Sequence, residues 1–444
     1  MQHTFAQLLG ILTAILAVAG IGYFLAALIA ARIFLSARSK PLAAFTPGVS
    51  ILKSLKGLDP GMIDAFRSHC RQSYAGEFEL LFGVASRSDP AAAAVQQLQA
   101  EFPNLPIKLI ECLQRLGTNG KVSSLVQLVP HASHNFLLIN DSDITVSPRY
   151  LERVMACFTP ETTSSETPQA TEKFKIESVL YQGGTSPGSP STGLRRWGGA
   201  SVVPQMPQKN AGALAPEEEV GLVTALYRGR AHHTLASTLE ALGIATDFHA
   251  GVLLSKWIEG GLHYGLGSTL AVRRDALDKI GGLLPLVDHL ADDYELGARI
   301  FAAGYRVALS DEVVETNIAA YGLRGFLDHQ LRWARTVRDA RPWGYAGLIF
   351  THGLGWALLN VVASGASLLS LWLLGLSFCL RIALAMTVGA EVLSDRQVLP
   401  CLWLLPLRDI VAMGVWVAGF AGNTIVWRGE RFSLKNGKLE KPGR

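Results

Sequence analysis

Charged residues are scarce in this chain. Only 17% of its 444 residues are Asp, Glu, Lys or Arg, whereas 49% are hydrophobic and the mean hydropathy is +0.26. That composition is too apolar for an ordinary soluble protein, and the apolar excess is concentrated near the two ends. The net charge of only +4 argues against nucleic acid as a partner and fits a protein with a membrane-facing edge.

Cysteine is also scarce, and its spacing excludes two common uses. The five cysteines form no C-x-x-C pair and no disulfide-rich pattern: Cys70, Cys112, Cys157, Cys379 and Cys401. Metal-binding cysteine pairs and a disulfide framework are therefore not expected. The polar central part of the chain fits a reducing compartment.

The N-terminal segment lacks both early charge and a cleavage site. Residues 8–35 carry no charged residue before Arg32 and are long enough to span a bilayer. No small-residue cleavage site follows, so residues 1–40 are expected to be an uncleaved anchor. Arg32, Arg38 and Lys40 follow the apolar run, whereas the first seven residues have no Lys or Arg. The positive-inside rule then places the N-terminus outside and the next part in the cytoplasm.

The C-terminal third contains more apolar runs, at 345–364, 366–390 and 397–427. The first two read as a hairpin, and the region 345–427 is expected to form two or three apolar helices. The third run contains Arg408 and Asp409, and charges at membrane depth are costly. A span, a re-entrant segment and an interfacial segment all remain open for it. The basic tail, 428–444, favours the cytoplasm, which conflicts with an odd number of C-terminal spans.

Between the apolar ends, residues 41–344 alternate between strand and helix patterns. Strands are predicted at 49–52, 78–84, 107–111, 137–139 and 220–225, and helices at 61–72, 91–101, 121–131, 231–242 and 324–338. This alternation predicts an α/β fold with a mainly parallel sheet and helices on both faces. Residues 159–218 are rich in Pro, Ser, Thr, Gly, Gln and Glu, so a disordered insertion is predicted there.

Two acids follow the most apolar of these strands. Asp141 and Asp143 come directly after it, and Asp89 stands at the end of another predicted strand. Open α/β sheets bind ligands beyond the carboxyl ends of their strands, and residues two apart on a regular strand share a face. Two carboxylates suit Mg²⁺ or Mn²⁺ held together with the phosphates of a substrate. The alternative is an Asx-type turn that only ends the strand.

Six short motifs occur in order between the apolar ends. They are Pro47–Lys53, Leu55–Pro60, Ser88–Pro90, Asp141–Asp143, Ala291–Tyr294 and Leu331–Trp333. With them the chain resembles the ceramide glucosyltransferases of glycosyltransferase family 21, including bacterial glycosyltransferases associated with hopanoid biosynthesis. The resemblance implies a GT-A type nucleotide-sugar-binding domain, a UDP-sugar donor, inversion at the anomeric carbon, and Mg²⁺ or Mn²⁺.

The resemblance also implies roles for residues at the nucleotide-sugar site. Asp89 is expected near the uracil and ribose, and Lys121 near the nucleotide. Asp141 and Asp143 are expected to hold the metal and the diphosphate.

The catalytic group implied by the resemblance is Asp293, as the general base. A carboxylate suits that role because the attacking hydroxyl must lose a proton. Its neighbour Asp292 is expected at the acceptor or sugar site. For both aspartates the alternative is a helix N-terminal cap. Arg332 and Trp333 match the end of a five-residue motif, and Arg332 would stabilise the leaving diphosphate. His329 stands where the family begins that motif with Gln or Arg.

Two further features have competing interpretations. His249 lies roughly where eukaryotic members have an important histidine, for the acceptor or the sugar, although a polar residue satisfied in a loop is the simpler interpretation. The basic face of the helix at 324–338, with Arg335 and Arg338, is either solvated or in contact with the lipid interface.

The sequence therefore predicts a membrane-bound enzyme. It would move glucose or N-acetylglucosamine from UDP-glucose or UDP-N-acetylglucosamine onto a lipid hydroxyl of ceramide or hopanoid type. A composition rich in Ala, Gly and Arg favours a bacterial inner membrane with the catalytic domain in the cytoplasm. A processive polysaccharide synthase is the alternative, although it needs more spans to form a channel. An inactive scaffold is disfavoured because all the acid sites are present.

Overall fold

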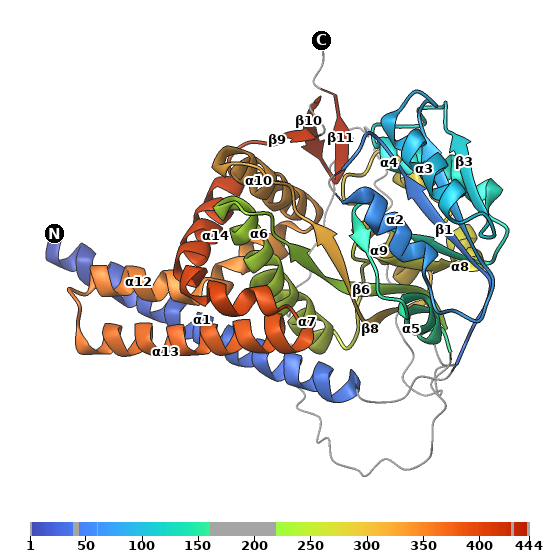
Figure 1. Ribbon diagram of the computed structural model, residues 1–444. Helices are drawn as coiled ribbons and strands as arrows, with labels where there is room; N and C mark the ends of the chain where they lie inside the picture. Colours follow the sequence, from blue (N-terminus) through green and yellow to red (C-terminus); the bar gives the residue numbers. More distant parts are fainter. Residues whose placement is uncertain (1, 39–43, 60, 160–218, 428–429, 442–444) are drawn as a thin grey trace, which may run out of the picture. The chain divides into compact units, whose positions relative to one another are not determined.

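The computed structural model describes residues 2–38, 44–59, 61–159, 219–427 and 430–441. Of the insertion predicted at 159–218, all residues except 159 lie outside the described residues. Figure 1 shows a sheet domain joined to a group of long apolar helices from both ends of the chain.

An eight-stranded sheet forms the centre of the domain. Its strands are β1 (Val49–Ser54), β2 (Phe78–Val84), β3 (Ile107–Glu111), β4 (Phe136–Ile139), β5 (Ile144–Thr145), β6 (Val220–Arg230), β7 (Leu270–Arg273) and β8 (Arg306–Asn317). They lie in the order β3-β2-β1-β4-β7-β6-β8-β5. The strands β3, β2, β1 and β4 are parallel, as are β6 and β8, whereas β7 runs antiparallel between β4 and β6. A mainly parallel sheet is therefore confirmed.

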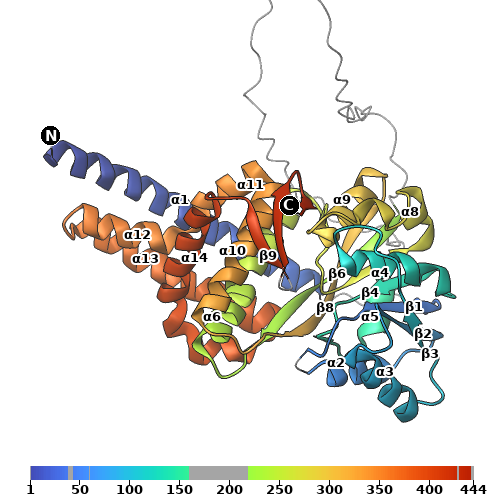
Figure 2. The same ribbon diagram turned by 90° about the horizontal axis from the view of Figure 1, so that it is seen from above.

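Both faces of the sheet are covered, as the continuous apolar runs of its strands require. Neighbouring residues such as Leu137 and Leu138 belong to different hydrophobic clusters, one on each face. One face packs against α2 (Met62–Cys70), α3 (Pro90–Glu101) and α5 (Tyr150–Ala156). The other packs against α4 (Gly120–Leu128), α8 (Arg274–Lys279) and α9 (Asp292–Ala302). Figure 2 shows α2 and α3 on the opposite side of the sheet from α4.

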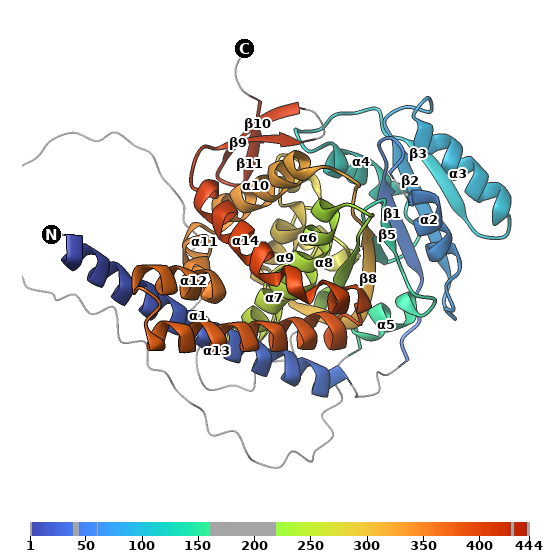
Figure 3. The same ribbon diagram turned by 60° about the vertical axis from the view of Figure 1, so that its left-hand side comes forward.

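The apolar helices run alongside one another. The structure has α1 (Gln2–Arg38), α11 (Pro342–Gly347), η4 (Leu348–Thr351), α12 (Gly353–Ala363), α13 (Leu368–Ala385), η5 (Met386–Val392), η6 (Arg396–Leu404) and α14 (Leu405–Gly419). Figures 1 and 3 show α12 and α13 beside α1. Gly20 of α1 lies against Gly353 of α12, where a side chain at either position would collide with backbone. Small residues at this crossing let the two helices approach closely.

Within the described residues, three helical stretches are long and apolar enough to cross a membrane. They are Phe5–Arg38, Leu368–Val392 and Arg396–Gly419. The predicted run at 345–364 is bent by 57° between Pro342–Thr351 and Gly353–Ala363, so it is not one straight helix. The C-terminal half of α1 also joins the core of the domain, because Phe24, Ala31 and Phe34 belong to the same buried cluster as Leu137.

A helical segment separates the sheet from these apolar helices. It consists of α6 (Leu235–Gly243), the π-helical turn η2 (Ile244–Phe248) and α7 (His249–Ile258). Thr234 caps α6, since its hydroxyl accepts a bond from the Ser237 N–H. The predicted helix at 231–242 therefore starts later and continues further than its sequence pattern indicated. It packs against α1 and α14.

The charges within the apolar helices form a buried network. Arg381 donates to both carboxylate oxygens of Asp409, at 2.9 Å each, and to the carbonyl and hydroxyl oxygens of Thr246, at 3.0 and 3.1 Å. Arg408 lies 3.7 Å from Asp247. The neighbours Arg408 and Asp409 thus pair with other elements and not with each other, and Arg381 joins α13 and α14 to η2.

Two 3-10 turns and a second sheet complete the described fold. The turns are η1 (Val129–His131) and η3 (Leu284–Leu286), and α10 spans Leu323–Ala340. The strands β9 (Thr424–Trp427), β10 (Glu430–Lys435) and β11 (Lys438–Glu440) form an antiparallel sheet in the order β11-β10-β9. Most of the basic tail predicted at 428–444 is therefore strand, and β9 takes the end of the predicted third apolar run.

Replacing Asp409 with Asn should destabilise the protein, because Arg381 would stay buried without its counter-charge. Breaking such a buried pair costs about 3–5 kcal/mol. A thermal unfolding scan of the detergent-solubilised protein should show a markedly lower Tm. Glu391→Gln is the matched control, since the Arg32–Glu391 pair is largely exposed and such a pair contributes at most about 1 kcal/mol. Equal Tm values for the two variants would contradict the importance of the network.

Candidate active site

The two acids after β4 lie in a turn and not on a strand. The strand ends at Ile139, so the expected shared strand face does not form. Asn140 anchors the turn by donating to the Tyr150 hydroxyl at 2.9 Å and to the Ser268 carbonyl at 2.6 Å. Ser142 donates to Asp59 at 2.7 Å. The turn is held by tertiary contacts that strand periodicity does not predict.

Lys121 joins this turn to the start of α9. Its ammonium lies 2.8 Å from the Asp141 carboxylate and 3.3 Å from that of Asp292. Asn119 caps α4 through the Val122 N–H and lies 3.3 Å from Asp292 as a donor. Burial acts to lower the pKa of Lys121, but the Asp141 and Asp292 carboxylates outweigh it and raise that pKa. The lysine is therefore a fixed positive charge.

Asp293 lies beside this cluster, in the first turn of α9. Its carboxylate accepts a bond from the Tyr294 N–H at 2.9 Å. A side chain at Gly267 would come within 3.0 Å of the Asp293 Oδ2, so this glycine leaves room for the acid. Burial and the neighbouring Asp292 raise the pKa of Asp293 to about 6, with Lys121 acting in the opposite direction. Ala291 is the N-cap of α9, so neither aspartate is the cap itself.

Asp89 is connected to the turn through a loop. It caps α3 by accepting from the Ala91 N–H at 2.9 Å, and it accepts from the Gly57 N–H at 2.9 and 3.1 Å. The loop that follows Gly57 carries Asp59, the partner of Ser142. The Asp89 carboxylate thus holds the loop that contacts the Asp141–Asp143 turn.

Lys53 is a site residue that the sequence reasoning missed. It ends the buried part of β1 and donates to the Asp141 carbonyl at 3.0 Å. Burial lowers the pKa of Lys53 to about 7, although Asp143 and Asp141 act to raise it. A lysine directly after the apolar run of a predicted strand was the available signal, because a lysine that becomes buried requires a partner.

Asp143 lies next to this lysine in a partly buried position. Its Oδ2 accepts a bond from the Thr316 hydroxyl at 2.5 Å. Burial, and then the charge of Asp141, raise the pKa of Asp143. The carboxylate therefore lies where additional positive charge would stabilise it.

The helix α10 presents His329 and Trp333 to an aromatic group. The Trp333 ring lies 5.6 Å from His329 and 6.0 Å from Phe248. His249 is buried at the start of α7, where its Nε2 donates to the Tyr227 carbonyl at 2.6 Å. It is therefore a helical residue, and the predicted polar loop position is wrong.

The basic face of α10 caps another helix. Arg335 donates to the Thr424 and Ala421 carbonyls at 2.6 and 2.9 Å, and Arg338 donates to the Gly419 carbonyl at 2.6 Å. These carbonyls lie at and just beyond the C-terminal end of α14, where positive charge is favourable. For Arg335 and Arg338, both the solvated and the lipid-contacting interpretations are thus replaced by protein contacts.

Comparison with known proteins identifies the family. Residues 12–176 and 209–440 match the family described as Glycosyl transferase family 21. The chain belongs to glycosyl transferase family 21. The family that the sequence motifs predicted, and the α/β fold with a mainly parallel sheet and apolar helices at both ends, are confirmed.

Similar proteins include two ceramide glucosyltransferases. "Ceramide glucosyltransferase 3" of Caenorhabditis elegans is 22% identical over 405 residues, which cover 87% of this chain and 73% of that protein. "Ceramide glucosyltransferase" of Candida albicans is 27% identical over 116 residues, which cover 24% of this chain and 21% of that protein. The mannosyltransferase PcManGT of Pyrobaculum calidifontis, solved with GDP-Man and Mn²⁺, is 16% identical to this chain. The two structures superpose with a TM-score of 0.44 over 91% of this chain and 97% of the mannosyltransferase chain. That TM-score is too low to support any conclusion about this chain.

In this glycosyltransferase, Asp141 and Asp143 fit a cation only if a substrate completes the site. The described residues contain no group of three or more His, Cys, Asp or Glu side chains arranged to hold a metal. The Asp141 side chain is 44% exposed, and burial, followed by the charge of Asp141, raises the pKa of the partly buried Asp143. Mg²⁺ is commonly bound by one or two carboxylates together with substrate phosphates. The residues present fit that arrangement.

The C-terminal sheet supports three parts of the site. Thr118, just before α4, donates to the Leu439 carbonyl at 3.1 Å. The Leu439 N–H donates to the Asp288 carbonyl at 2.8 Å, in the loop before α9. The Gly437 N–H bonds to Asp339 of α10. The β10–β11 hairpin therefore contacts three elements: the start of α4, which carries Lys121, the loop before α9, which carries Asp293, and α10.

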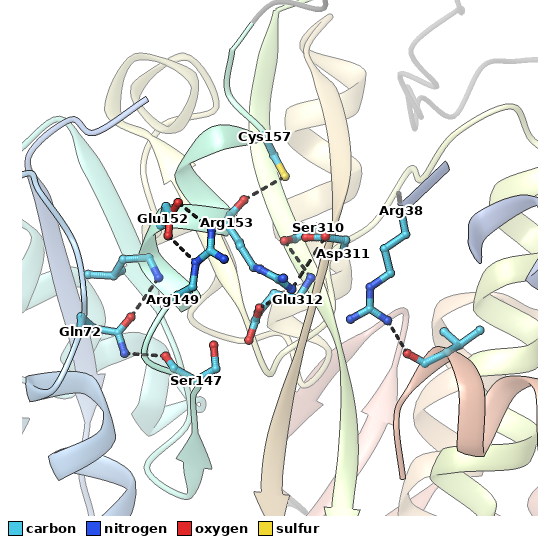
Figure 4. Close-up of polar contacts among 12 residues, drawn as sticks. Arg38, Gln72, Ser147, Arg149, Glu152, Arg153, Cys157, Ser310, Asp311 and Glu312 are labelled. Carbon is cyan, nitrogen blue, oxygen red and sulfur yellow. Dashed lines mark hydrogen bonds and ion pairs between the residues drawn. The ribbon is translucent and has the colours of Figure 1, made fainter. Parts of the chain in front are cut away.

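An open pocket of about 430 Å³ lies away from the acid cluster, between the bulged part of β8 and the end of α1. Figure 4 shows its arginines engaged with protein groups. Arg149 lies 2.8 Å from Glu152, Arg153 lies 3.3 Å from Glu312, and Arg38 donates to the Val392 carbonyl at 2.9 Å. The Arg38 bond joins α1 to η5, whereas the other two contacts lie within the sheet domain.

Removing residues 430–444 should reduce glycosyl transfer at least tenfold, because Thr118, the Asp288 loop and Asp339 lose their partners. A lost buried hydrogen bond costs about 1–3 kcal/mol. Product formation by the full-length and shortened proteins in the same membranes provides the measurement. Removing only residues 442–444 is the control, and a shortened protein with full turnover would show that the hairpin does not support the site.

Proposed function

We propose that this protein is a membrane-bound inverting glycosyltransferase. It transfers glucose or N-acetylglucosamine from UDP-glucose or UDP-N-acetylglucosamine to a hydroxyl of a membrane lipid of ceramide or hopanoid type. The main supporting observation is that Lys121 links Asp141 to the α9 acids, at the carboxyl edge of the sheet. The apolar helices packed on the same domain support a lipid acceptor. The relatives named ceramide glucosyltransferases support the same conclusion.

The donor would bind where the strand ends gather polar groups. Asp89 holds the loop after β1, and we assign the uracil and ribose to this side. The diphosphate would lie near Asp141, Asp143 and Lys121, because Lys121 supplies a fixed positive charge. When bound at Asp141 and Asp143, Mg²⁺ or Mn²⁺ would add positive charge near the diphosphate.

Asp293 would act as the general base. As the acceptor oxygen forms its bond to the anomeric carbon, its proton passes to the Asp293 carboxylate. The bond from that carbon to the diphosphate oxygen breaks, and the electron pair leaves with UDP. A pKa raised to about 6 keeps Asp293 ionised at neutral pH and makes it more basic than an exposed aspartate. Lys121 and Arg332 would stabilise the negative charge of the leaving diphosphate.

The same side of the membrane would hold donor and acceptor. Arg32 and Arg38 lie at the domain end of α1, which supports a cytoplasmic domain. We extend this to a bacterial inner membrane on the basis of composition. A processive polysaccharide synthase is less well supported, because the described residues provide three candidate spans, or four if the bent pair is one span. That number is small for a polymer channel.

The decisive assay uses membranes that contain the protein. They are incubated with UDP-glucose or UDP-N-acetylglucosamine, each with ceramide or a hopanoid polyol, and the lipid products are weighed by mass spectrometry. One donor and acceptor pair should give a lipid heavier by one sugar. Membranes without the protein are the control. Soluble polymer in place of glycolipid would favour the polysaccharide synthase.

Asp293→Asn should abolish lipid glycosylation while leaving nucleotide binding largely intact, because Asn has a similar shape but cannot accept the proton. Turnover should fall by about 10²-fold or more, and titration with UDP should give a Kd close to that of the unchanged protein. Near-normal turnover would show that another group is the base.

The dependence of kcat on pH at the acidic side of the profile should reflect the ionisation of Asp293. Because the base must be deprotonated, kcat should rise as pH increases through about 6. In Asp292→Asn the neighbouring negative charge that raises this pKa is removed, so the rise in kcat should move to lower pH. In Lys121→Met the opposing positive charge is lost, and the rise in kcat should move to higher pH. If the pH at which kcat rises were the same in both variants as in the unchanged protein, Asp293 would not be the group that titrates.

A further inference from the structure

Several buried polar atoms between α6, α10 and α14 lack hydrogen-bond partners. Among the described residues, no partner is found for Glu240 Oε2, the Tyr321 hydroxyl, His329 Nδ1, or Nε and Nη1 of Arg408. Folded proteins satisfy nearly all of their buried polar groups. Several unmade bonds in one region therefore indicate a place for a polar molecule.

Glu240, Tyr321 and His329, which we call the polar cluster, come from neighbouring elements. Glu240 lies on α6 and is only 6% exposed. His329 Nδ1 is 3.0 Å from Glu240 Oε1, an ion-pairing distance, but the two groups are not aligned for a hydrogen bond. The Tyr321 ring lies 6.0 Å from the His329 ring. The second oxygen of Glu240 thus remains available to an outside donor.

Aromatic rings connect the polar cluster to the proposed base. The His329 ring lies 5.6 Å from Trp333, Trp333 lies 6.0 Å from Phe248, and Phe248 lies 5.7 Å from Tyr227. Burial, followed by the charges of Asp293 and Glu240, raises the pKa of Tyr227. Tyr227 is therefore within electrostatic reach of both acids. These rings thus form a continuous row of contacts from the polar cluster to Tyr227.

The polar cluster also borders the apolar helices. The guanidinium of Arg408 on α14 lies directly over Gly243, which is close to Glu240 on α6. A side chain at position 243 would collide with that guanidinium, so the glycine permits the contact. Figures 1 and 3 show α6 near α10 and α14, and both helices contact it. This region therefore lies between the candidate spans and the aromatic rings.

We propose that the polar cluster binds the uncharged, hydroxyl-bearing head group of the lipid acceptor. The inference rests on the proposed function and adds a recognition site to it. Glu240 Oε2 would accept a hydrogen bond from one head-group hydroxyl, and the Tyr321 hydroxyl would bond to a second polar group of the head. The lipid chains would extend toward α14 and α1. A second polar group is needed to satisfy both sites, so a head with a hydroxyl and an amide, or with several hydroxyls, fits best.

The Glu240 carboxylate favours a head group that carries a hydroxyl, because a carboxylate is a strong hydrogen-bond acceptor for a hydroxyl. The Glu240 oxygen would then discriminate between membrane lipids, because a lipid without a hydroxyl would leave it unpaired.

The test compares Glu240→Gln and Tyr321→Phe with the unchanged full-length protein in detergent. Short-chain ceramide and UDP-glucose are the probes. Each variant should raise the KM for the ceramide about tenfold, as expected for one lost buried hydrogen bond, while the KM for UDP-glucose stays within about twofold. Tyr74→Phe is the matched control, because it also loses one hydroxyl bond, to the Pro47 carbonyl. Its KM for the ceramide should not change.

A donor-free measurement separates this inference from the proposed function. Equilibrium dialysis of the short-chain ceramide against the full-length protein measures acceptor binding without sugar transfer. Binding about tenfold weaker in Glu240→Gln supports the polar cluster even if no glycolipid forms with either UDP-sugar, a result that would overturn only the proposed function. Equal binding by both proteins, or a change confined to the KM for UDP-glucose, overturns the inference.

Discussion

One buried ammonium group, that of Lys121, fixes the geometry of the candidate active site. It lies 2.8 Å from Asp141 and 3.3 Å from Asp292, two acids from distant parts of the chain. Without this positive charge, the carboxylates of Asp141, Asp292 and Asp293 would repel one another in a partly buried space. The Lys121 ammonium on α4 therefore helps to hold the turn after β4 beside the first turn of α9.

The supports of Lys121 come from distant parts of the chain. Asn119 caps α4 and also contacts Asp292, so the helix that carries the lysine is tied to the acid that binds it. Thr118 bonds to Asp288 and to the Leu439 carbonyl near the C-terminus. The end of the chain thus contributes to a site whose charged groups lie far earlier in the sequence. The site and the C-terminal sheet form one connected arrangement.

The sequence predicts elements well where local pattern decides the structure. The strands at 78–84 and 107–111 were predicted with their observed bounds because each is an apolar run between turns. β8 was missed because charged residues such as Asp311 interrupt its apolar pattern, and its position depends on pairing with β6.

The same distinction applies to the site. Asp141 was singled out by its motif and Lys121 by the family resemblance, and the structure brings the two together. Lys53 and Glu240 were missed, because their significance depends on partners across the fold: the Asp141 carbonyl for Lys53, and His329 for Glu240. Under the proposed function, a lipid acceptor must reach a charged, water-soluble donor without carrying its chains into water. The ring pair of Trp333 and Phe248, 6.0 Å apart, would offer the lipid chains an apolar surface while a hydroxyl group approached Asp293.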